Sequence, residues 1–200
     1  MKRAGLTKSG CLLGVLICAV PLIPAQQPAQ LNESGQVVVA GHTLHYRIRR
    51  LPVSSFPHLP APIQEQLTQR GCLIPQTYEA HAPENVIHAS LEHPGSSDWA
   101  VLCSQQGTVS LLVFFATGPA QVLATAPETE RLQSHDASGV LGFNWGIDPG
   151  SPDRVHEAQA GLERRPGRID HDALADSHID RKTIYHYYSK SAWILLEMPD

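Results

Sequence analysis

Apolar and polar residues alternate near both ends of the chain in the manner typical of β-hairpins. Residues 36–40 and 43–49 flank Gly41, and residues 183–188 and 193–197 flank a Ser-Lys turn. In the strand over 43–49, alternate side chains fall on opposite faces: Leu44, Tyr46 and Ile48 on one, His45, Arg47 and Arg49 on the other. This alternation predicts strands with one buried face.

The centre of the chain carries the strongest strand pattern, over residues 86–91, 99–103 and 108–115. Residues 99–103 are apolar on both faces, which is typical of a central strand. We therefore expect three consecutive antiparallel strands to form the core. Its main side chains should be Trp99, Val101, Leu102, Leu111, Val113 and Phe115.

Helices are predicted in three places. One begins at Pro62 and ends at Gly71, because proline suits a first helical turn and glycine a last one. A second begins after Ser151, an N-cap residue, and runs to about Arg164. A third is expected over 170–180, where Asp172, Asp176 and Asp180 recur every four residues.

The sequence thus predicts an α+β fold in one domain over 36–200. We expect an antiparallel sheet, formed by the meander over 86–115 and the two terminal hairpins, with a few short helices. Residues 26–35 are polar and are expected to be a disordered lead-in. Residues 118–133 are expected to be a long irregular connection, followed by a strand over 140–145.

The first 25 residues have the layout of a secretory signal peptide. Lys2, Arg3 and Lys8 precede an apolar stretch over 11–23, and Ala25 offers a small residue at a cleavage point. The apolar stretch is shorter than the ~20 residues of a membrane span. We therefore expect a secreted or periplasmic protein with no transmembrane span.

Cleavage changes both the charge and the cysteine content. The leader holds three of the 15 Lys and Arg residues and none of the 19 Asp and Glu residues, so the formal net charge falls from −4 to −7. A negative domain is a poor partner for nucleic acid. Cys72 and Cys103 remain, and in an oxidising compartment we expect a disulfide between them; a free reactive thiol is the alternative.

Residues 89–91 and 95–102 together resemble one blade unit of the FG-GAP repeats of β-propellers. The matching segments are Ala-Ser-Leu and Gly-Ser-Ser-Asp-Trp-Ala-Val-Leu, and the resemblance implies a strand–loop–strand arrangement. Of the carboxylates expected in the calcium-binding loop of that family, only Asp98 is present. More broadly, segments 71–76 and 97–103 and the expected acidic helix before a Tyr-rich final hairpin resemble uncharacterised secreted bacterial proteins, a resemblance that implies no activity.

The densest group of possible metal ligands is His171, Asp172, Asp176, His178 and Asp180. On a helix the three aspartates would share one face, and a divalent cation could compensate their repulsion. Parallel side chains do not converge on an ion, however, and two histidines seven residues apart lie roughly 10 Å apart. We therefore expect a solvent-exposed acidic face rather than a tight site.

Other catalytic signatures are missing from the sequence. His156 and Glu157 lack the second histidine of a zincin motif, and no Gly-x-Ser-x-Gly segment is present. The loop holding Ser96, Ser97 and Asp98, with His93 nearby, does not establish a triad, because a triad is defined by its geometry in space.

An aromatic segment gives the alternative to catalysis. Phe143, Asn144 and Trp145 lie between glycines, and Tyr185 and Tyr187 could extend an aromatic surface of the kind that binds glycans or peptides. Packing in the core is the competing interpretation of these side chains. We expect an exported, non-catalytic binding or interaction domain that needs no cofactor and meets an extracytoplasmic ligand or protein. The alternative is a metal-dependent hydrolase that uses residues 171–180.

Overall fold

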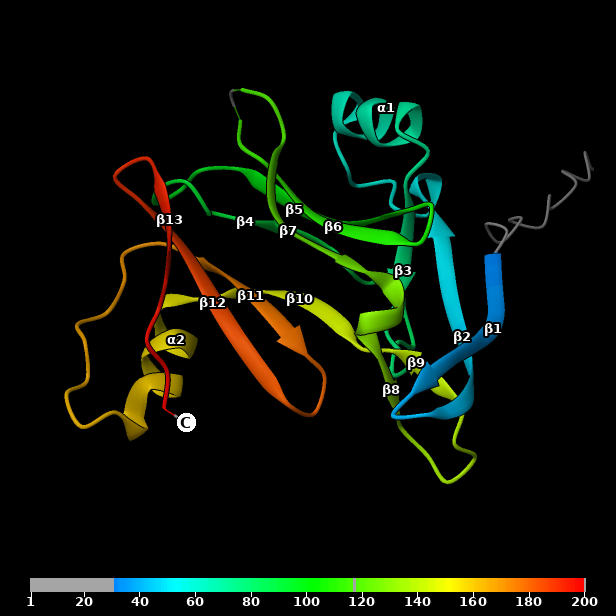
Figure 1. Cartoon of the computed structure of the whole chain (residues 1–200). Helices are drawn as coiled ribbons and strands as arrows, with labels where there is room; N and C mark the ends of the chain where they lie inside the picture. Colours follow the sequence, from blue (N-terminus) through cyan, green and yellow to red (C-terminus); the bar gives the residue numbers. More distant parts are fainter. Residues whose placement is uncertain (1–30, 117, 200) are drawn as a thin grey trace, which may run out of the picture.

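Two β-sheets face one another, and each carries an α-helix on its outer face (Figure 1). The computed structural model describes residues 31–116 and 118–199. The predicted signal peptide and residues 26–30 lie outside the described residues. Within those residues, no helix has both the length and the apolar character needed to cross a membrane.

The larger sheet has nine strands, and its main path runs in the order β7-β6-β5-β3-β2-β9-β8, with β1 paired to β2 and β4 paired to β5. Its strands are β1 (Leu31–Val39), β2 (His42–Pro52), β3 (Leu73–Gln76), β4 (Val86–Ala89), β5 (Asp98–Gln105), β6 (Thr108–Phe114), β7 (Gln121–Pro127), β8 (Leu132–Ser134) and β9 (Leu141–Phe143). The pairing of β2 with β9 is parallel, whereas the other pairings in this sheet are antiparallel.

The smaller sheet is antiparallel, in the order β10-β11-β12-β13. Its strands are β10 (Trp145–Gly150), β11 (Ala173–His178), β12 (Lys182–Ser189) and β13 (Ala192–Leu195). The helices are α1 (Ala61–Gln69) and α2 (Pro152–Ala158), with short 3-10 turns at Val53–Ser55, Glu128–Arg131 and Gln159–Gly161. Ser151 caps α2 by accepting a hydrogen bond from the Arg154 amide at 3.3 Å.

Strand alternation sorts the core into layers. Leu102 and Leu111 of the larger sheet face the smaller sheet and pack in one cluster with Trp145 and Leu174. Their neighbours in sequence face the other way and pack against Leu67 of α1; these are Val101, Cys103 and Leu112. On the far side of the smaller sheet, a third cluster joins Val155 of α2 to Ala173, Ala175 and Tyr185. The order is therefore helix, sheet, sheet, helix.

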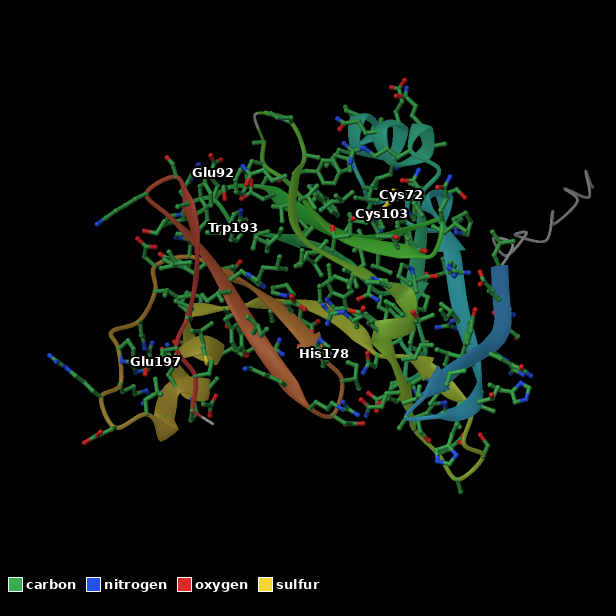
Figure 2. All side chains as sticks on the ribbon, in the orientation of Figure 1. Cys72, Glu92, Cys103, His178, Trp193 and Glu197 are labelled. Carbon is green, nitrogen blue, oxygen red and sulfur yellow. A yellow bond between two sulfur atoms is a disulfide. The ribbon has the colours of Figure 1, made fainter. Side chains whose placement is uncertain are left out.

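The predicted meander and disulfide are confirmed. β4 pairs with β5 and β5 pairs with β6, both antiparallel. Of the six expected core side chains, Val101, Leu102, Leu111 and Val113 are fully buried, whereas Trp99 and Phe115 are only partly buried. Cys72, just after α1, is bonded to Cys103 on β5 with a Cα–Cα distance of 5.2 Å (Figure 2). The bond excludes the alternative of a free thiol, and closing a loop of 31 residues contributes about 3–4 kcal/mol of stability. Both terminal hairpins are also present.

The predicted α+β class is wrong, because 48% of the structure is strand and only 15% helical. Two segments account for much of the error. Residues 170–180 hold strand β11 instead of a helix, and residues 118–133, expected to be irregular, hold β7 and the beginning of β8. Residues 31–35 of the predicted lead-in belong to β1. The second helix also ends earlier than expected, at Ala158. Pairing with neighbouring strands outweighs local helical spacing in such segments.

Candidate functional site

A polar groove with a volume of about 530 Å³ lies where β2, β9 and two loops meet. The loops are residues 77–80, after β3, and residues 135–140, between β8 and β9. We call it the arginine groove. Its main side chains come from Arg47, Arg49, Tyr78, His135 and Asp136, and its floor from Leu141, Gly142 and Phe143. A volume of 300–1,000 Å³ is typical of small-molecule sites.

Two cations project into the groove from the polar face of β2. Arg47 and Arg49 are two residues apart, so both lie on the face opposite the buried Ile48. Arg49 is half-buried and donates a hydrogen bond from Nη2 to the carbonyl oxygen of Ala80 at 2.7 Å. Arg47 is exposed, and within residues 31–116 and 118–199 its guanidinium has no hydrogen-bond or ion-pair partner. Its donors are therefore free for a ligand.

An aromatic pair forms another wall of the groove. The rings of Tyr78 and His135 stack with centroids 4.6 Å apart and planes 8° from parallel. The Tyr78 hydroxyl donates a hydrogen bond to Oδ2 of Asp180 at 2.7 Å, which links the wall to the β11–β12 turn. Burial, together with this carboxylate, raises the pKa of Tyr78 to about 12, so the phenol stays neutral at physiological pH.

Gly142 makes this stacking possible. A Cβ atom at Gly142 would lie 2.6 Å from the Cβ of Tyr78 and 3.2 Å from Cδ2 of His135. Any other residue at this position would push the wall away from β9. The backbone of β9 is therefore part of the site although it offers no side chain there.

Asp136 is the one carboxylate among the residues that line the groove, and its hydrogen-bond donors come from its own loop. Asp136 accepts hydrogen bonds from the amide and the hydroxyl of Ser138, at 2.8 and 2.5 Å. The two bonds lower the pKa of Asp136, which keeps it ionised. Nδ1 of His135 lies 3.7 Å from Oδ2 of Asp136. The two arginines are thus left without a carboxylate partner within the described residues, and the groove suits an anionic group.

The aromatic residues predicted to bind a ligand are mostly core residues. Phe143, Asn144 and Trp145 are at most 2% exposed, and Tyr185 is 5% exposed. Tyr187 is half-buried and donates from its hydroxyl to Oδ1 of Asp170 at 2.6 Å; burial and this bond raise the pKa of Tyr187 to about 12. Phe143 alone also lines the arginine groove. The competing interpretation of these side chains as core packing fits the structure better.

The residues that the alternative hypothesis assigns to a metal do not lie on a helix, and each has its own partner. His171 faces Oδ1 of Asp170 at 2.6 Å and the carbonyl oxygen of Tyr188 at 2.9 Å. Asp172 accepts from the Ser90 amide at 3.1 Å, and Asp180 accepts from Tyr78. In the part of the chain that the structure describes, no group of three or more histidine, cysteine or acidic side chains could hold a metal ion.

The prediction of a solvent-exposed acidic face is wrong for Asp176, which is 4% exposed. Its carboxylate accepts from the indole of Trp145 at 2.6 Å and faces Nε2 of His186 at 3.2 Å. His178, labelled in Figure 2, lies two residues further along β11 and contacts Arg131. The Arg131 guanidinium stacks over the Trp145 ring at 3.9 Å. This network fastens the smaller sheet to the segment between β7 and β8.

The serine-rich loop before β5 is also structural. Asp98 is fully buried, and its Oδ2 accepts from the amides of Leu91 and Glu92, each at 2.8 Å, and from the Ser96 hydroxyl. The exposed Ser97 hydroxyl lies 2.7 Å from Nε2 of His88. No carboxylate of the described chain contacts the other ring nitrogen of His88, so this pair lacks the third group of a triad.

Sequence reasoning identified the polar face of β2 but not the groove. The signal was the placement of Arg47 and Arg49 on one face of a half-buried strand. Tyr78 and His135, 57 positions apart in the sequence, meet only because β9 pairs with β2 and carries the adjoining loop beside it. Comparisons of this chain with protein-family models, curated proteins and solved structures found no match.

Proposed function

We propose that this chain is an exported, non-catalytic binding module that holds an anionic ligand in the arginine groove. The observation that carries the proposal is the unpartnered guanidinium of Arg47 beside Arg49, in a groove of small-molecule size. Guanidinium forks match the geometry of carboxylates and phosphates.

The stacked wall narrows the ligand class. Tyr78 and His135 present flat aromatic rings, and a flat ring is a surface on which sugars pack. A carboxylate on a sugar packed against that ring would face the arginines that line the same groove. An acidic oligosaccharide combines both features. Export is supported by the predicted leader, and the disulfide is compatible with it.

The test is calorimetric titration of the protein with two trisaccharides of equal size, trigalacturonate and the neutral maltotriose. We expect trigalacturonate to bind at least roughly tenfold more tightly, which corresponds to about 1.4 kcal/mol. Arg47→Gln should weaken trigalacturonate binding by a similar factor. Arg164→Gln, at an exposed cation outside the groove, is the matched control and should leave it unchanged. If the wild type bound both sugars with equal affinity, or if both variants changed trigalacturonate binding equally, the proposal of an anionic ligand would be rejected.

A further inference from the structure

The beginning of β12 has an open edge on the side that faces β13. β11 pairs with β12 over Lys182–His186, whereas β13 pairs with it only from His186 to Ser189. Beyond this pairing, one further backbone hydrogen bond joins β12 to the chain after β13, from the Leu196 amide to the carbonyl oxygen of Tyr185 at 2.9 Å. Because peptide groups alternate in direction along a strand, the N–H and C=O of Thr183 point to the same side as those of Tyr185. No strand of the described chain pairs with Thr183 on that side.

The chain after β13 cannot close this edge, because it is fastened to the helix α2 region instead. Gln159 donates from Nε2 to the carbonyl oxygen of Glu197 at 3.0 Å. Met198 packs in the cluster around Val155, and Pro199 lies against Gly161, where an added Cβ would be 3.1 Å from the proline ring. Figure 1 shows this last segment running down to α2, and Figure 2 places Glu197 there.

The beginning of β12 and the chain after β13 leave a groove of about 550 Å³ between them, which we call the edge groove. It is lined by Arg181, Lys182, Thr183, Ile184, Leu195, Leu196, Met198 and Pro199. Its walls are mostly aliphatic, and Leu195 is 66% exposed. Arg181 and Lys182 are exposed at one end, and neither forms an ion pair with the residues the structure describes. This local positive charge contrasts with the net charge of −4 of the chain.

We propose that the edge groove binds an extended, acidic–apolar peptide segment of a partner protein, which adds a strand to β12. The unpaired N–H and C=O of Thr183 would bond its backbone, as in other cases of strand addition to a sheet edge. Ile184 and Leu195 would receive its apolar side chains, and Arg181 and Lys182 an acidic one. The charge at the groove favours this occupant over a second copy of the chain, because pairing of two β12 edges would bring the exposed Arg181 and Lys182 of both copies close together.

The proposal is independent of the arginine groove and is tested with defined peptides. The probes are four acetylated octapeptides with an aspartate at each end, in which threonine alternates with valine, isoleucine, leucine or phenylalanine. Two controls are made for the tightest binder: one with lysines in place of the aspartates, and one with its central amides N-methylated. Binding is measured by calorimetry, and the exchange of the Thr183 amide is followed by NMR.

We expect at least one acidic peptide to bind and to slow exchange of the Thr183 amide. The lysine peptide and the N-methylated peptide should bind at least roughly tenfold more weakly. The double variant R181E/K182E should show the same loss, whereas R164E, at an exposed arginine outside the groove, should bind as wild type.

Three results would overturn the proposal. The first is that none of the four peptides binds. The second is that the N-methylated or lysine peptide binds as tightly as its parent. The third is that the free protein forms dimers in sedimentation equilibrium and the Thr183 amide is already protected in them, which would assign the edge to a second copy.

Discussion

The indole N–H of Trp145 donates a hydrogen bond to Oδ1 of Asp176 at 2.6 Å, and both side chains are buried. Trp145 lies on β10 and Asp176 on β11, while His186 on β12 faces the other carboxylate oxygen at 3.2 Å. One carboxylate therefore joins three adjacent strands of the smaller sheet. The sequence predicts that Asp176 belongs to an exposed acidic helix face, whereas in the fold it is a buried residue that links strands.

Replacing this carboxylate should destabilise the fold strongly. Asp176→Leu leaves the Trp145 N–H without an acceptor in the core, so we expect a loss of about 3 kcal/mol in the free energy of unfolding, measured in urea. Asp180→Asn, at an exposed aspartate with a single hydrogen bond to Tyr78, is the control and should cost less than about 1 kcal/mol. Similar costs for both variants would show that the buried bonds of Asp176 contribute little.

A second buried carboxylate, Glu128, lies on the 3-10 turn after β7 and binds Arg50 of strand β2. Arg50 donates to Glu128 from Nε at 2.9 Å and from Nη2, and the Ser104 hydroxyl donates to the same carboxylate at 2.5 Å. Glu128→Ala leaves a buried guanidinium with Glu33 as its remaining carboxylate partner, so we expect a loss of about 3 kcal/mol.

The exposed pair of Arg168 and Asp153 provides the control for Glu128. Both side chains are more than half exposed, so Asp153→Ala should cost no more than about 1 kcal/mol in the same urea experiment. If the loss at Glu128 were no larger than the loss at Asp153, burial of the Arg50–Glu128 pair would not be what makes it important.

Adding one methyl group at Gly142 should disturb the arginine groove. The new Cβ of Gly142→Ala would collide with Tyr78, so we expect a loss of about 1–3 kcal/mol in stability and weaker trigalacturonate binding. Gly167→Ala is the matched control, because nothing lies within 4 Å of its added Cβ. Thermal unfolding measures the loss of stability, and calorimetry measures the binding. If Gly142→Ala bound trigalacturonate as tightly as wild type, the Tyr78–His135 wall would not be part of the binding site.

Acid should weaken the contact between His178 and Arg131. Burial, and then the charge of Arg131, lower the pKa of His178, while Asp176 opposes the shift and Arg181 adds to it. The folded state therefore resists protonation of His178, whereas the unfolded chain takes up the proton near pH 6.5. The contribution of His178 to stability is present above that pH and falls as the pH drops below it, down to the pKa of the folded state.

The measurement is the free energy of unfolding of wild type and His178→Gln between pH 7.5 and 5. The variant should lose less stability over this range, because its side chain takes up no proton. The remaining histidines are common to both proteins and cancel in the difference. If the free energies of unfolding of the two proteins fell in parallel with pH, His178 would not be the source of this pH dependence.

The sequence by itself determined the features that depend on neighbouring residues. Alternation placed Arg47 and Arg49 on the polar face of a strand, and apolar residues on both faces marked residues 99–103 as central. The turn at Gly41 and the proline that opens α1 were also readable, because turns and helix ends are local events. The bond between Cys72 and Cys103 followed from there being only two cysteines beyond the predicted leader.

Only the tertiary structure decided which segments pair and which polar side chains become buried. Residues 170–180 have helical spacing of aspartates, yet β10 and β12 pair with them on both sides, and strand pairing provides the backbone hydrogen bonds that a helix would otherwise make internally. The arginine groove exists because β9 joins β2 in parallel and brings His135 to Tyr78. The edge groove exists because the end of the chain is bound to the α2 region rather than to β12. Both grooves depend on contacts between distant segments, and such contacts follow from the packing of the whole chain.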